Sequence, residues 1–373
     1  MRDLLVCTHT PVLRSGQAVR TYGVARALAA HRELDLLYVR FGADEPDAAF
    51  RAIPGISFHE VLASRAMARL LAYGSARAAG VPAGFARGCS PELAAQASAL
   101  ASEDGRGRVI ADGPIAAAAL RALARRRPVI YNAHNLESGF RGEADAVGKL
   151  HARAIRRFER GLLARAAESW MVSEPDLAGA SALCPAANLR YAPNVVDVAS
   201  IKPVSPRVSE QRAIFVASFR YTPNRNGLRF LIEEVFPLVW AELPRARLAL
   251  VGAGLEQPPS EDPRVETLGF VENLADAYAS ASCAVVPLLQ SGGTPLKLIE
   301  ALAYGLPVIA TRLAASGLAL RDGEHCLLAD DAAAYASALI GVLRDGAPEL
   351  ARGGRKLAAE RYSIEALSAL LAP

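Results

Sequence analysis

Short apolar runs, each followed by a stretch of helical character, recur along the 373 residues of this chain and restrict its fold more than any other feature. Such runs are typical of strands that are buried on both faces of a parallel sheet. We predict strands at residues 4–7, 34–39, 109–111 and 129–131 in the first half, and at 213–217, 248–251, 265–268, 283–287 and 308–310 in the second. We predict helices at 18–30, 115–126 and 143–166, between the strands of the second half, and in a tail that starts at Ala332. The fold class is therefore α/β, with two doubly wound parallel-sheet domains.

The chain is long enough for two domains, because single cores stop growing at about 250–300 residues. Segment 193–206 holds three prolines in fourteen residues and is the predicted hinge. We predict an N-terminal domain over 1–192 and a C-terminal domain over 207–361. Ligands of open parallel sheets bind beyond the carboxyl ends of the strands, so we expect the active site in a central cleft that both domains face.

Loops rich in glycine and polar residues follow several predicted strands, at the edge where such ligands bind. In the first domain these loops are 9–17 and 134–135. In the second domain they are 252–254, 269–273 and 292–297. They are the candidate walls of the cleft.

The loop at 292–297 leads into a short helix with its own start and stop signals. Thr294 can cap the helix, Pro295 suits its first turn, and Gly305 and Pro307 favour its end. We therefore predict a ten-residue helix over 295–304 that is largely apolar and buried.

Glu300 lies among the apolar residues of this helix and needs a partner, because a lone buried carboxylate is rarely tolerated. One partner is Lys297, one turn earlier on the same face. The other is a ligand, because the loop of Gly292 and Gly293 and the helix N-terminus can bind a diphosphate while Glu300 binds ribose hydroxyls. Only four of the 42 basic residues are lysines, which hints that Lys297 serves a site that needs a compact charge.

This segment resembles the donor-site signature of retaining GT-B glycosyltransferases of family four, the glycosyl transferases group 1. The signature usually has two glutamates separated by seven residues, and the first would fall at position 292, which is glycine here. The chain resembles a variant of the family that has a Gly-Gly-Thr loop and a lysine three residues before the remaining glutamate. Further segments that carry the resemblance are 131–137, 192–197, 214–224 and 268–274.

The resemblance implies a GT-B fold of two Rossmann-like domains, with a C-terminal helix within 362–373 that crosses back to the first domain. It implies that His134, Lys297 and Arg220 are the catalytic residues. The implied donor-binding residues are Glu300, Gly292, Gly293, Thr294, Pro295, Leu296, Ser218, Gly252 and Val271. The implied acceptor-side residues are Gly16, Gln17 and Arg20.

The implied reaction is transfer of a sugar from a nucleotide-diphosphate sugar to an acceptor hydroxyl, with retention by front-face attack. Negative charge grows on the departing phosphate, and Lys297, Arg220 and the amides of 293–296 can stabilise it. No cofactor and no metal ion is then expected, and no Asp, His or Cys cluster has convincing metal-ligand spacing. We expect a hexosyltransferase whose partners are the donor and an unidentified acceptor, and no nucleic acid.

Two other functions remain open. A nucleotide-sugar epimerase of the same fold would need acid and base carboxylates, for which Glu137 and Asp112 are the candidates, although the sequence identifies no partner for either. A non-catalytic protein that binds a nucleotide sugar or a partner protein is the third hypothesis, because position 292 is glycine.

Composition and charge bear on location. The odd number of cysteines, five, indicates free thiols in a reducing compartment, and no targeting signal or membrane span is visible, so we expect a cytoplasmic protein. Residues 1–200 carry 25 basic and 19 acidic residues, and the excess lies in 65–77 and 121–127. Each stretch is either a solvated helix face or a basic amphipathic helix on the inner face of an anionic membrane.

Overall fold

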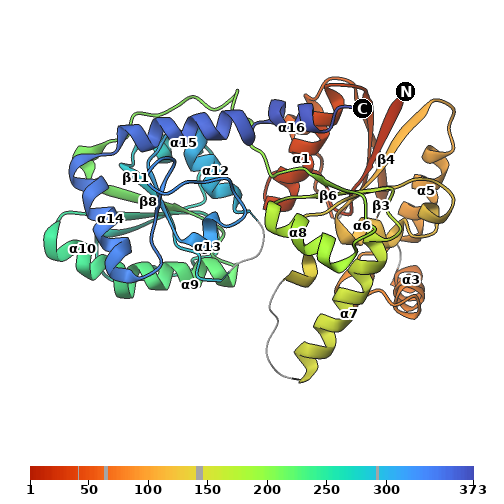
Figure 1. The fold of residues 1–373 in the computed structure, drawn as a ribbon, viewed down its shortest axis with the longest axis horizontal. Coiled ribbons are helices and arrows are strands. Elements are labelled where there is room, and N and C mark those ends of the chain that lie inside the picture. Colours follow the sequence, from red (N-terminus) through yellow and green to blue (C-terminus); the bar gives the residue numbers. More distant parts are fainter. Residues whose placement is uncertain (41, 63–65, 140–145, 291–293) are drawn as a thin grey trace. The chain divides into compact units, whose positions relative to one another are not determined.

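The computed structural model describes residues 1–40, 42–62, 66–139, 146–290 and 294–373. It divides the chain into two compact units, and helices flank the sheet of each unit (Figure 1). The first unit comprises Met1–Asn194 and Leu367–Pro373, and the second comprises Val195–Ala366. The predicted α/β class with two parallel sheets is confirmed.

The first unit contains a seven-stranded parallel sheet in the order β3-β2-β1-β4-β5-β6-β7. Its strands are β1 (Arg2–Val6), β2 (Glu33–Arg40), β3 (Ile56–Leu62), β4 (Arg106–Asp112), β5 (Ile130–Asn132), β6 (Glu168–Met171) and β7 (Leu189–Tyr191). Its helices are α1 (Gly16–Ala29), α2 (Ala48–Arg51), α3 (Ala66–Ala78), α4 (Ala83–Ala86), α5 (Pro91–Ala101), α6 (Gly113–Ala119), α7 (Ala146–Leu163) and α8 (Glu174–Leu183), with 3-10 turns η1 (Leu123–Arg125) and η2 (Glu137–Gly139). The strand order reverses between β1 and β4, and ligands of open α/β sheets bind at such a switch point.

The second unit contains a six-stranded parallel sheet in the order β10-β9-β8-β11-β12-β13. Its strands are β8 (Arg212–Val216), β9 (Arg247–Val251), β10 (Val265–Gly269), β11 (Cys283–Val286), β12 (Val308–Ala310) and β13 (Leu327–Leu328). Its helices are η3 (Val208–Glu210), α9 (Thr222–Phe230), the π-helical turn η4 (Leu231–Val235), α10 (Phe236–Glu242), α11 (Leu274–Ala279), α12 (Leu296–Ala303), α13 (Arg312–Ala315), α14 (Ala332–Asp345), α15 (Pro348–Arg361) and the start of α16 (Ile364–Leu370). Here the order reverses between β8 and β11, which places the loops after these two strands at the switch point.

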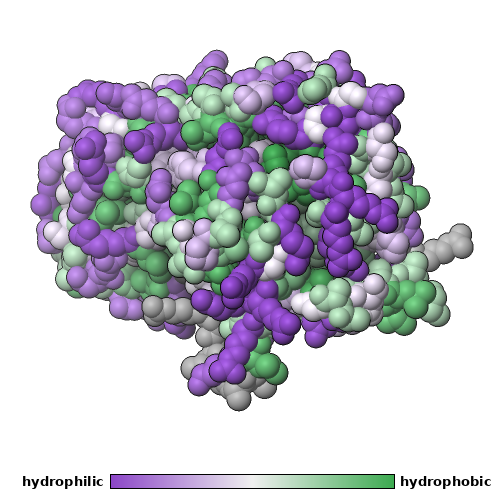
Figure 2. Space-filling view, turned by 45° about the vertical axis from the view of Figure 1, so that its right-hand side comes forward, coloured by the Kyte–Doolittle hydropathy of each residue, from purple (hydrophilic) through white to green (hydrophobic). Residues whose placement is uncertain are grey.

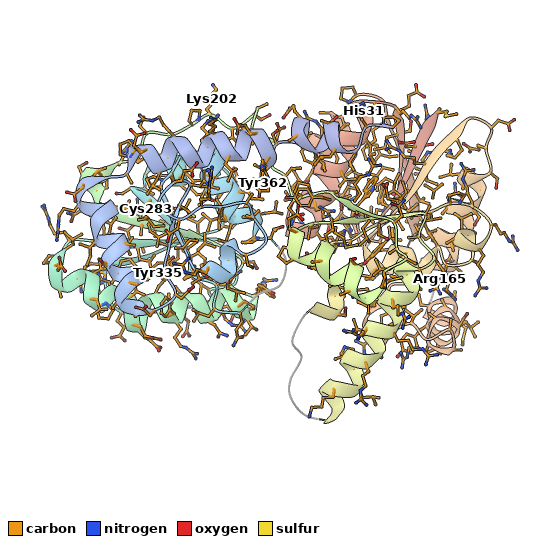
Figure 3. All side chains as sticks on the ribbon, in the orientation of Figure 1. His31, Arg165, Lys202, Cys283, Tyr335 and Tyr362 are labelled. Carbon is orange, nitrogen blue, oxygen red and sulfur yellow. The ribbon has the colours of Figure 1, made fainter. Side chains whose placement is uncertain are left out.

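Apolar side chains on both faces of the central strands explain why these segments form buried strands. Every residue from Leu4 to Val6 in β1 is buried, as is every residue of β11. In the second unit Tyr335 of α14 is fully buried and donates its hydroxyl to the carbonyl oxygen of Ile309 in β12 at 2.8 Å (Figure 3). All five cysteines are buried and unpaired, including Cys283 (Figure 3).

All nine predicted strands are present, eight of them within one or two residues at each end, and β4 begins three residues earlier than predicted; β3, β6, β7 and β13 were not predicted. β3 lies at a sheet edge and most of its residues are only partly buried, so its sequence alternates irregularly. The predicted helix over 115–126 is confirmed only as far as Ala119, where α6 ends, and a separate 3-10 turn follows. The guanidinium of Arg121 donates to the carbonyl oxygen of Ala118 at 3.0 Å and so satisfies a terminal carbonyl of α6.

The chain passes between the units twice, at Asn194–Val195 and at Ala366–Leu367. Within segment 193–206, the amide of Val196 donates to the carbonyl oxygen of Tyr362 at 2.9 Å and that of Val204 to Tyr304 at 2.8 Å, both inside the second unit. In the first unit, Arg108 and Arg190 donate to the carbonyl oxygens of Leu371 and Leu370 at 2.6 and 2.8 Å. The final seven residues are therefore part of the first unit, whereas the hinge role of 193–206 stays a prediction.

Within the described part of the chain, no helix has the length and apolar character that crossing a membrane requires.

Candidate functional site

Helix α12 lies at the switch point of the second unit and begins one residue later than predicted. Its N-cap is Pro295 rather than Thr294, and Thr294 is buried just before it. The helix ends at Ala303, one residue before the predicted end, and Gly305 follows with φ +78°. The amide of Gly305 donates to the carbonyl oxygen of Leu302, and the amide of Leu306 donates to that of Ala301. Gly292 and Gly293, two of the predicted donor-binding residues, lie outside the described residues.

Lys297 lies in the first turn of α12 and is directed toward α9. Its ammonium donates a hydrogen bond to Oδ1 of Asn224, and it lies 5.1 Å from the centre of the Phe215 ring. Burial lowers the pKa of Lys297 to about 7. The predicted alternative of a pair between Lys297 and Glu300 is therefore replaced by a bond to a neutral amide.

Glu300 lies one turn further along α12 and contacts an aromatic pair. The hydroxyl of Tyr278 in α11 donates to Oε2 of Glu300 at 3.3 Å, and Tyr278 stacks on Tyr304 with ring centres 4.5 Å apart. Burial raises the pKa of Glu300 to about 7, although the hydrogen bond from Tyr278 opposes this. Glu300 thus has a protein partner that the sequence did not reveal.

The loops after β8, β9 and β10 bring other predicted donor-site residues to the same edge of the sheet. Ser218 and Arg220 follow β8 and are exposed. Gly252 follows β9 with φ +130°, and an added Cβ would lie 1.9 Å from the carbonyl oxygen of Ala217, so only glycine fits there. Its amide donates to the carbonyl oxygen of Gly269 at 2.7 Å.

Two apolar residues of the predicted donor site, Leu296 and Val271, pack against one hydrophobic cluster of the second unit. This unit therefore presents a helix N-terminus with an ammonium group, a carboxylate one turn away, and apolar surface beside them. A diphosphate, two ribose hydroxyls and a flat base are the groups that such a surface can bind.

The first unit gathers a second polar cluster at its own switch point, around the buried carboxylate of Asp112 at the end of β4. Asp112 accepts hydrogen bonds from Nε2 of His134 at 2.8 Å, from the Asn132 amide at 2.6 Å and from the Thr21 hydroxyl at 2.5 Å. Burial alone would raise its pKa, but His134, His9 and Thr21 lower the pKa of Asp112 to about 2. The sequence identified no partner for Asp112, and the structure corrects this.

The predicted acceptor-side residues occupy different environments on α1. Gly16 and Gln17 are exposed, and the Gln17 amide lies 3.2 Å from Nδ1 of His9. Arg20 is only 3% exposed and donates to the Asn132 side chain, the Asn194 side chain and the Ala192 carbonyl. Arg20 therefore ties the ends of β5 and β7 together inside the first unit, rather than presenting a free guanidinium.

Glu137, the other candidate for acid–base chemistry, begins η2 just after His134. The Glu159 carboxylate on α7 accepts from the backbone amides of Glu137 and Ser138 at 2.8 and 2.9 Å and so caps this turn. Burial and the nearby charge of Glu159 raise the pKa of Glu137 to about 7. Glu137 can hold a proton near neutral pH, whereas Asp112 is ionised and fully hydrogen-bonded.

In the part of the chain that the structure describes, no group of three or more His, Cys, Asp or Glu residues is placed to hold a metal ion.

The architecture of two parallel-sheet α/β units is the GT-B fold. Sucrose-phosphate synthase of Thermosynechococcus elongatus matches it with a TM-score of 0.73 at 19% identity, covering 99% of this chain and 96% of that one. HepE of Anabaena in complex with UDP matches with a TM-score of 0.69 at 14% identity, covering 99% of this chain and 98% of that one.

Residues 210–345 match the family model described as glycosyl transferases group 1, so the second unit carries a domain of this family. The chain is 32% identical over 191 residues to a phosphatidyl-myo-inositol mannosyltransferase of Mycolicibacterium smegmatis, covering 48% of this chain and 49% of that protein. It is 34% identical over 135 residues to the Mycobacterium leprae protein of the same name, covering 34% of this chain and 36% of that protein. The alignments thus span about half or less of these relatives.

Proposed function

We propose that this protein is a retaining glycosyltransferase that moves a sugar from a nucleotide-diphosphate donor to an acceptor hydroxyl. The observation that carries the proposal is the arrangement on α12, where Lys297 at the helix N-terminus and Glu300 one turn later match the two polar parts of a nucleoside diphosphate. The family match of residues 210–345 covers this helix. HepE in complex with UDP shares the fold, which supports a nucleotide donor.

In this proposal the second unit binds the nucleotide. The amide groups at the start of α12, Lys297 and the exposed Arg220 bind the diphosphate, because all three carry positive charge or free N–H donors. Glu300 accepts hydrogen bonds from the ribose hydroxyls, in place of or beside Tyr278. Gly252 and Ser218 line the same edge, and Val271 and Leu296 supply apolar contact for the base.

The chemical step breaks the bond between the sugar carbon and the phosphate oxygen and forms a bond between that carbon and the acceptor oxygen on the same face. The acceptor proton passes to the departing phosphate, whose growing charge Lys297 and Arg220 stabilise. No protein-bound metal ion and no cofactor is needed, because these groups already supply positive charge. His134, oriented by Asp112, contacts the donor sugar in this mechanism.

A panel of nucleotide sugars tests the proposal, with nucleoside diphosphate release measured with and without added simple glycosides as acceptors. Slow release without acceptor, with retained configuration in the product, supports a glycosyltransferase. An altered sugar that is still attached to its diphosphate would instead identify an epimerase, in which Glu137 is the group suited to carry the proton. Binding of a nucleotide sugar without turnover would identify a non-catalytic protein that binds nucleotide sugars.

We further propose that an anionic membrane surface is where the first unit meets its acceptor. In α3, Met67, Leu70 and Leu71 are 69%, 63% and 69% exposed, and Arg69 and Arg77 on the same helix are also exposed. Figure 2 shows apolar surface of this helix at the lower right of the molecule. A helix with exposed leucines beside arginines suits the boundary between lipid headgroups and acyl chains.

The second basic stretch, 121–127, does not support membrane binding. It forms no amphipathic helix, and Arg127 donates to the carbonyl oxygens of Ala101, Arg106 and Gly107. Arg65, which belongs to the first stretch, lies outside the described residues.

A further inference from the structure

Asn224 is the side chain that joins α9 to α12 at the switch point of the second unit. It is the third residue of α9 and only 5% exposed. Its Nδ2 donates to the carbonyl oxygen of Ser218 at 2.7 Å, and its Oδ1 accepts from the Lys297 ammonium. A carbonyl oxygen can only accept, so the bond to Ser218 fixes the orientation of the amide and directs Oδ1 at Lys297.

The chemistry of this partner matters because an amide oxygen accepts a hydrogen bond but carries no charge. An aspartate at the same place would hold the ammonium as firmly and would also neutralise it. Among the residues that the structure describes, no carboxylate forms an ion pair with the Lys297 ammonium. Phe215 presents a ring face, Glu300 accepts from Tyr278, and Arg225 on α9 donates to carbonyl oxygens of its own loop.

We propose that Asn224 is a positioning residue of the donor site, which holds the Lys297 ammonium at the start of α12 and leaves its charge free for a diphosphate. The inference rests on the proposed function, because the anion is the diphosphate of the donor. Asn224 touches neither the sugar nor the phosphate in this proposal, and it acts through Lys297. Asn224 also links the loop of Ser218 to α12, because its side chain is hydrogen-bonded to both of these parts of the proposed diphosphate site.

Two substitutions separate the two properties of the Asn224 side chain at Lys297, namely its hydrogen-bond acceptor and its lack of charge. Asn224→Leu and Asn224→Asp both lose the donor to Ser218, so any difference between them reports the acceptor and its charge. Asn226 supplies matched controls two residues further along α9, where its amide lies 3.4 Å from Gln290 and does not contact Lys297. Asn226→Asp adds the same charge to the same helix.

The pKa of Lys297 distinguishes a positioning role from a structural one, because it would not change if Asn224 only supported the fold. The chain has only four lysines, so protein labelled with ¹³C at lysine Cε gives four signals, and Lys297→Arg assigns the relevant one. The other three, Lys149, Lys202 and Lys356, are exposed internal standards. Melting curves of each variant show whether it is folded before its signals are compared.

Binding is measured on the full chain with UDP, GDP and ADP, and the tightest of the three is used throughout. We expect Lys297 to titrate below the other lysines and to gain a proton when the nucleoside diphosphate binds. Asn224→Asp should raise the pKa of Lys297, because a nearby carboxylate favours the charged ammonium. It should also weaken nucleoside diphosphate binding by about tenfold or more, because the carboxylate competes with the diphosphate for that ammonium. Asn224→Leu should also weaken binding, whereas Asn226→Asp and a matching Asn226→Leu should leave the pKa of Lys297 and the binding unchanged.

The outcomes distinguish the two proposals. If Lys297 titrates identically in the parent, Asn224→Leu and Asn224→Asp while the parent binds nucleoside diphosphate, the role of Asn224 is wrong and the proposed function stands. Equal weakening by Asn224→Asp and Asn226→Asp would also overturn it, because a general charge effect would then explain both. If none of the three nucleoside diphosphates binds the parent protein, the proposed function itself fails.

Discussion

The imidazole ring of His134 stands directly over Gly113, where an added Cβ would lie 2.8 Å from the ring carbon Cε1, while Nε2 of the same ring lies 2.8 Å from Oδ1 of Asp112. Two consecutive residues at the end of β4 therefore position the histidine, one by a hydrogen bond and the other by leaving room. Nε2 of the ring is thus committed to Asp112, and Nδ1 is its other hydrogen-bonding nitrogen.

Gly113→Ala should displace His134 without removing any polar group. A hydrogen bond to a charged group contributes about 1.5–3 kcal/mol, so we expect kcat to fall by about 10- to 100-fold if the histidine contact is lost. Gly105→Ala is the control, because Gly105 also has a positive φ, +75°, but an added Cβ there meets nothing within 4 Å. Equal kcat values for the two variants would show that His134 needs no such placement.

Lys297→Ala and Glu300→Ala should impair the reaction in different ways. Lys297 stabilises charge that grows in the transition state, so its loss lowers kcat, by about 10- to 100-fold for one charge-assisted hydrogen bond. Glu300 binds the ribose equally in the ground and transition states, so its loss mainly raises KM for the donor. Lys202→Ala, at an exposed position, is the control, and steady-state kinetics with varied donor make the comparison.

Glu300→Gln should stabilise the folded protein above neutral pH while it weakens donor binding. The folded-state pKa of Glu300 is about 7 and its ordinary value is 4.5, so the folded protein holds a proton that the unfolded protein has lost. The free energy of unfolding therefore falls as pH rises from about 4.5 to about 7, and the loss is complete above that range. Because Glu300 is partly exposed, we expect a gain of about 1–2 kcal/mol for the variant at pH 8.

Thermal unfolding at pH 5 and pH 8 measures this effect. The stability difference between Glu300→Gln and the parent should be small at pH 5 and should appear at pH 8. A variant that is equally or less stable than the parent at pH 8 would contradict the raised pKa of this carboxylate.

Leu70→Gln combined with Leu71→Gln should reduce binding to lipid vesicles that contain 30% anionic phosphatidylglycerol. Each buried leucine contributes about 1.5–3 kcal/mol to partitioning when fully transferred from water, so the double variant should bind at least tenfold more weakly. Leu238→Gln, which alters an exposed leucine of the second unit, is the control. Sedimentation with vesicles makes the measurement, and equal binding of all three proteins would exclude α3 as the contact.

Sugar transfer should persist in excess chelator. The groups proposed to stabilise the leaving phosphate are Lys297, Arg220 and backbone amides, none of which binds a divalent ion. Activity is measured before and after exhaustive treatment with EDTA. Activity that disappears with EDTA and returns with magnesium or manganese would mean that these groups do not suffice.

Sequence patterns predicted the central strands because a run such as Leu4–Val6 is apolar on both faces. They did not predict β3, whose edge position leaves most of its side chains partly exposed. They placed a helix over 115–126, because the run of alanines at its start favours a helix and contains no stop signal. In the structure α6 ends at Ala119, and the side chain of Arg121 donates to the carbonyl oxygen of Ala118, a contact that sequence patterns do not show.

Sequence patterns identified residues of the candidate site but did not identify their hydrogen-bond partners. Glu300 stood out as a carboxylate in an apolar helix, yet its partner Tyr278 lies on α11, 22 residues earlier. Lys297 stood out as a rare lysine, and its partner Asn224 is 73 residues away. The strand order places β8 beside β11, and this brings Asn224, which follows β8, next to Lys297, which follows β11.

The two crossings between the units have a consequence for biosynthesis. The second unit is continuous in sequence, so all of its residues have been made before the ribosome reaches Leu367. The first unit is begun before the second but completed after it, because the carbonyl groups of Leu370 and Leu371 that Arg190 and Arg108 bind are made only after Ala366. Until then the partly buried Arg108 lacks that acceptor, so the N-terminal half must await residues 367–373 before its structure is complete.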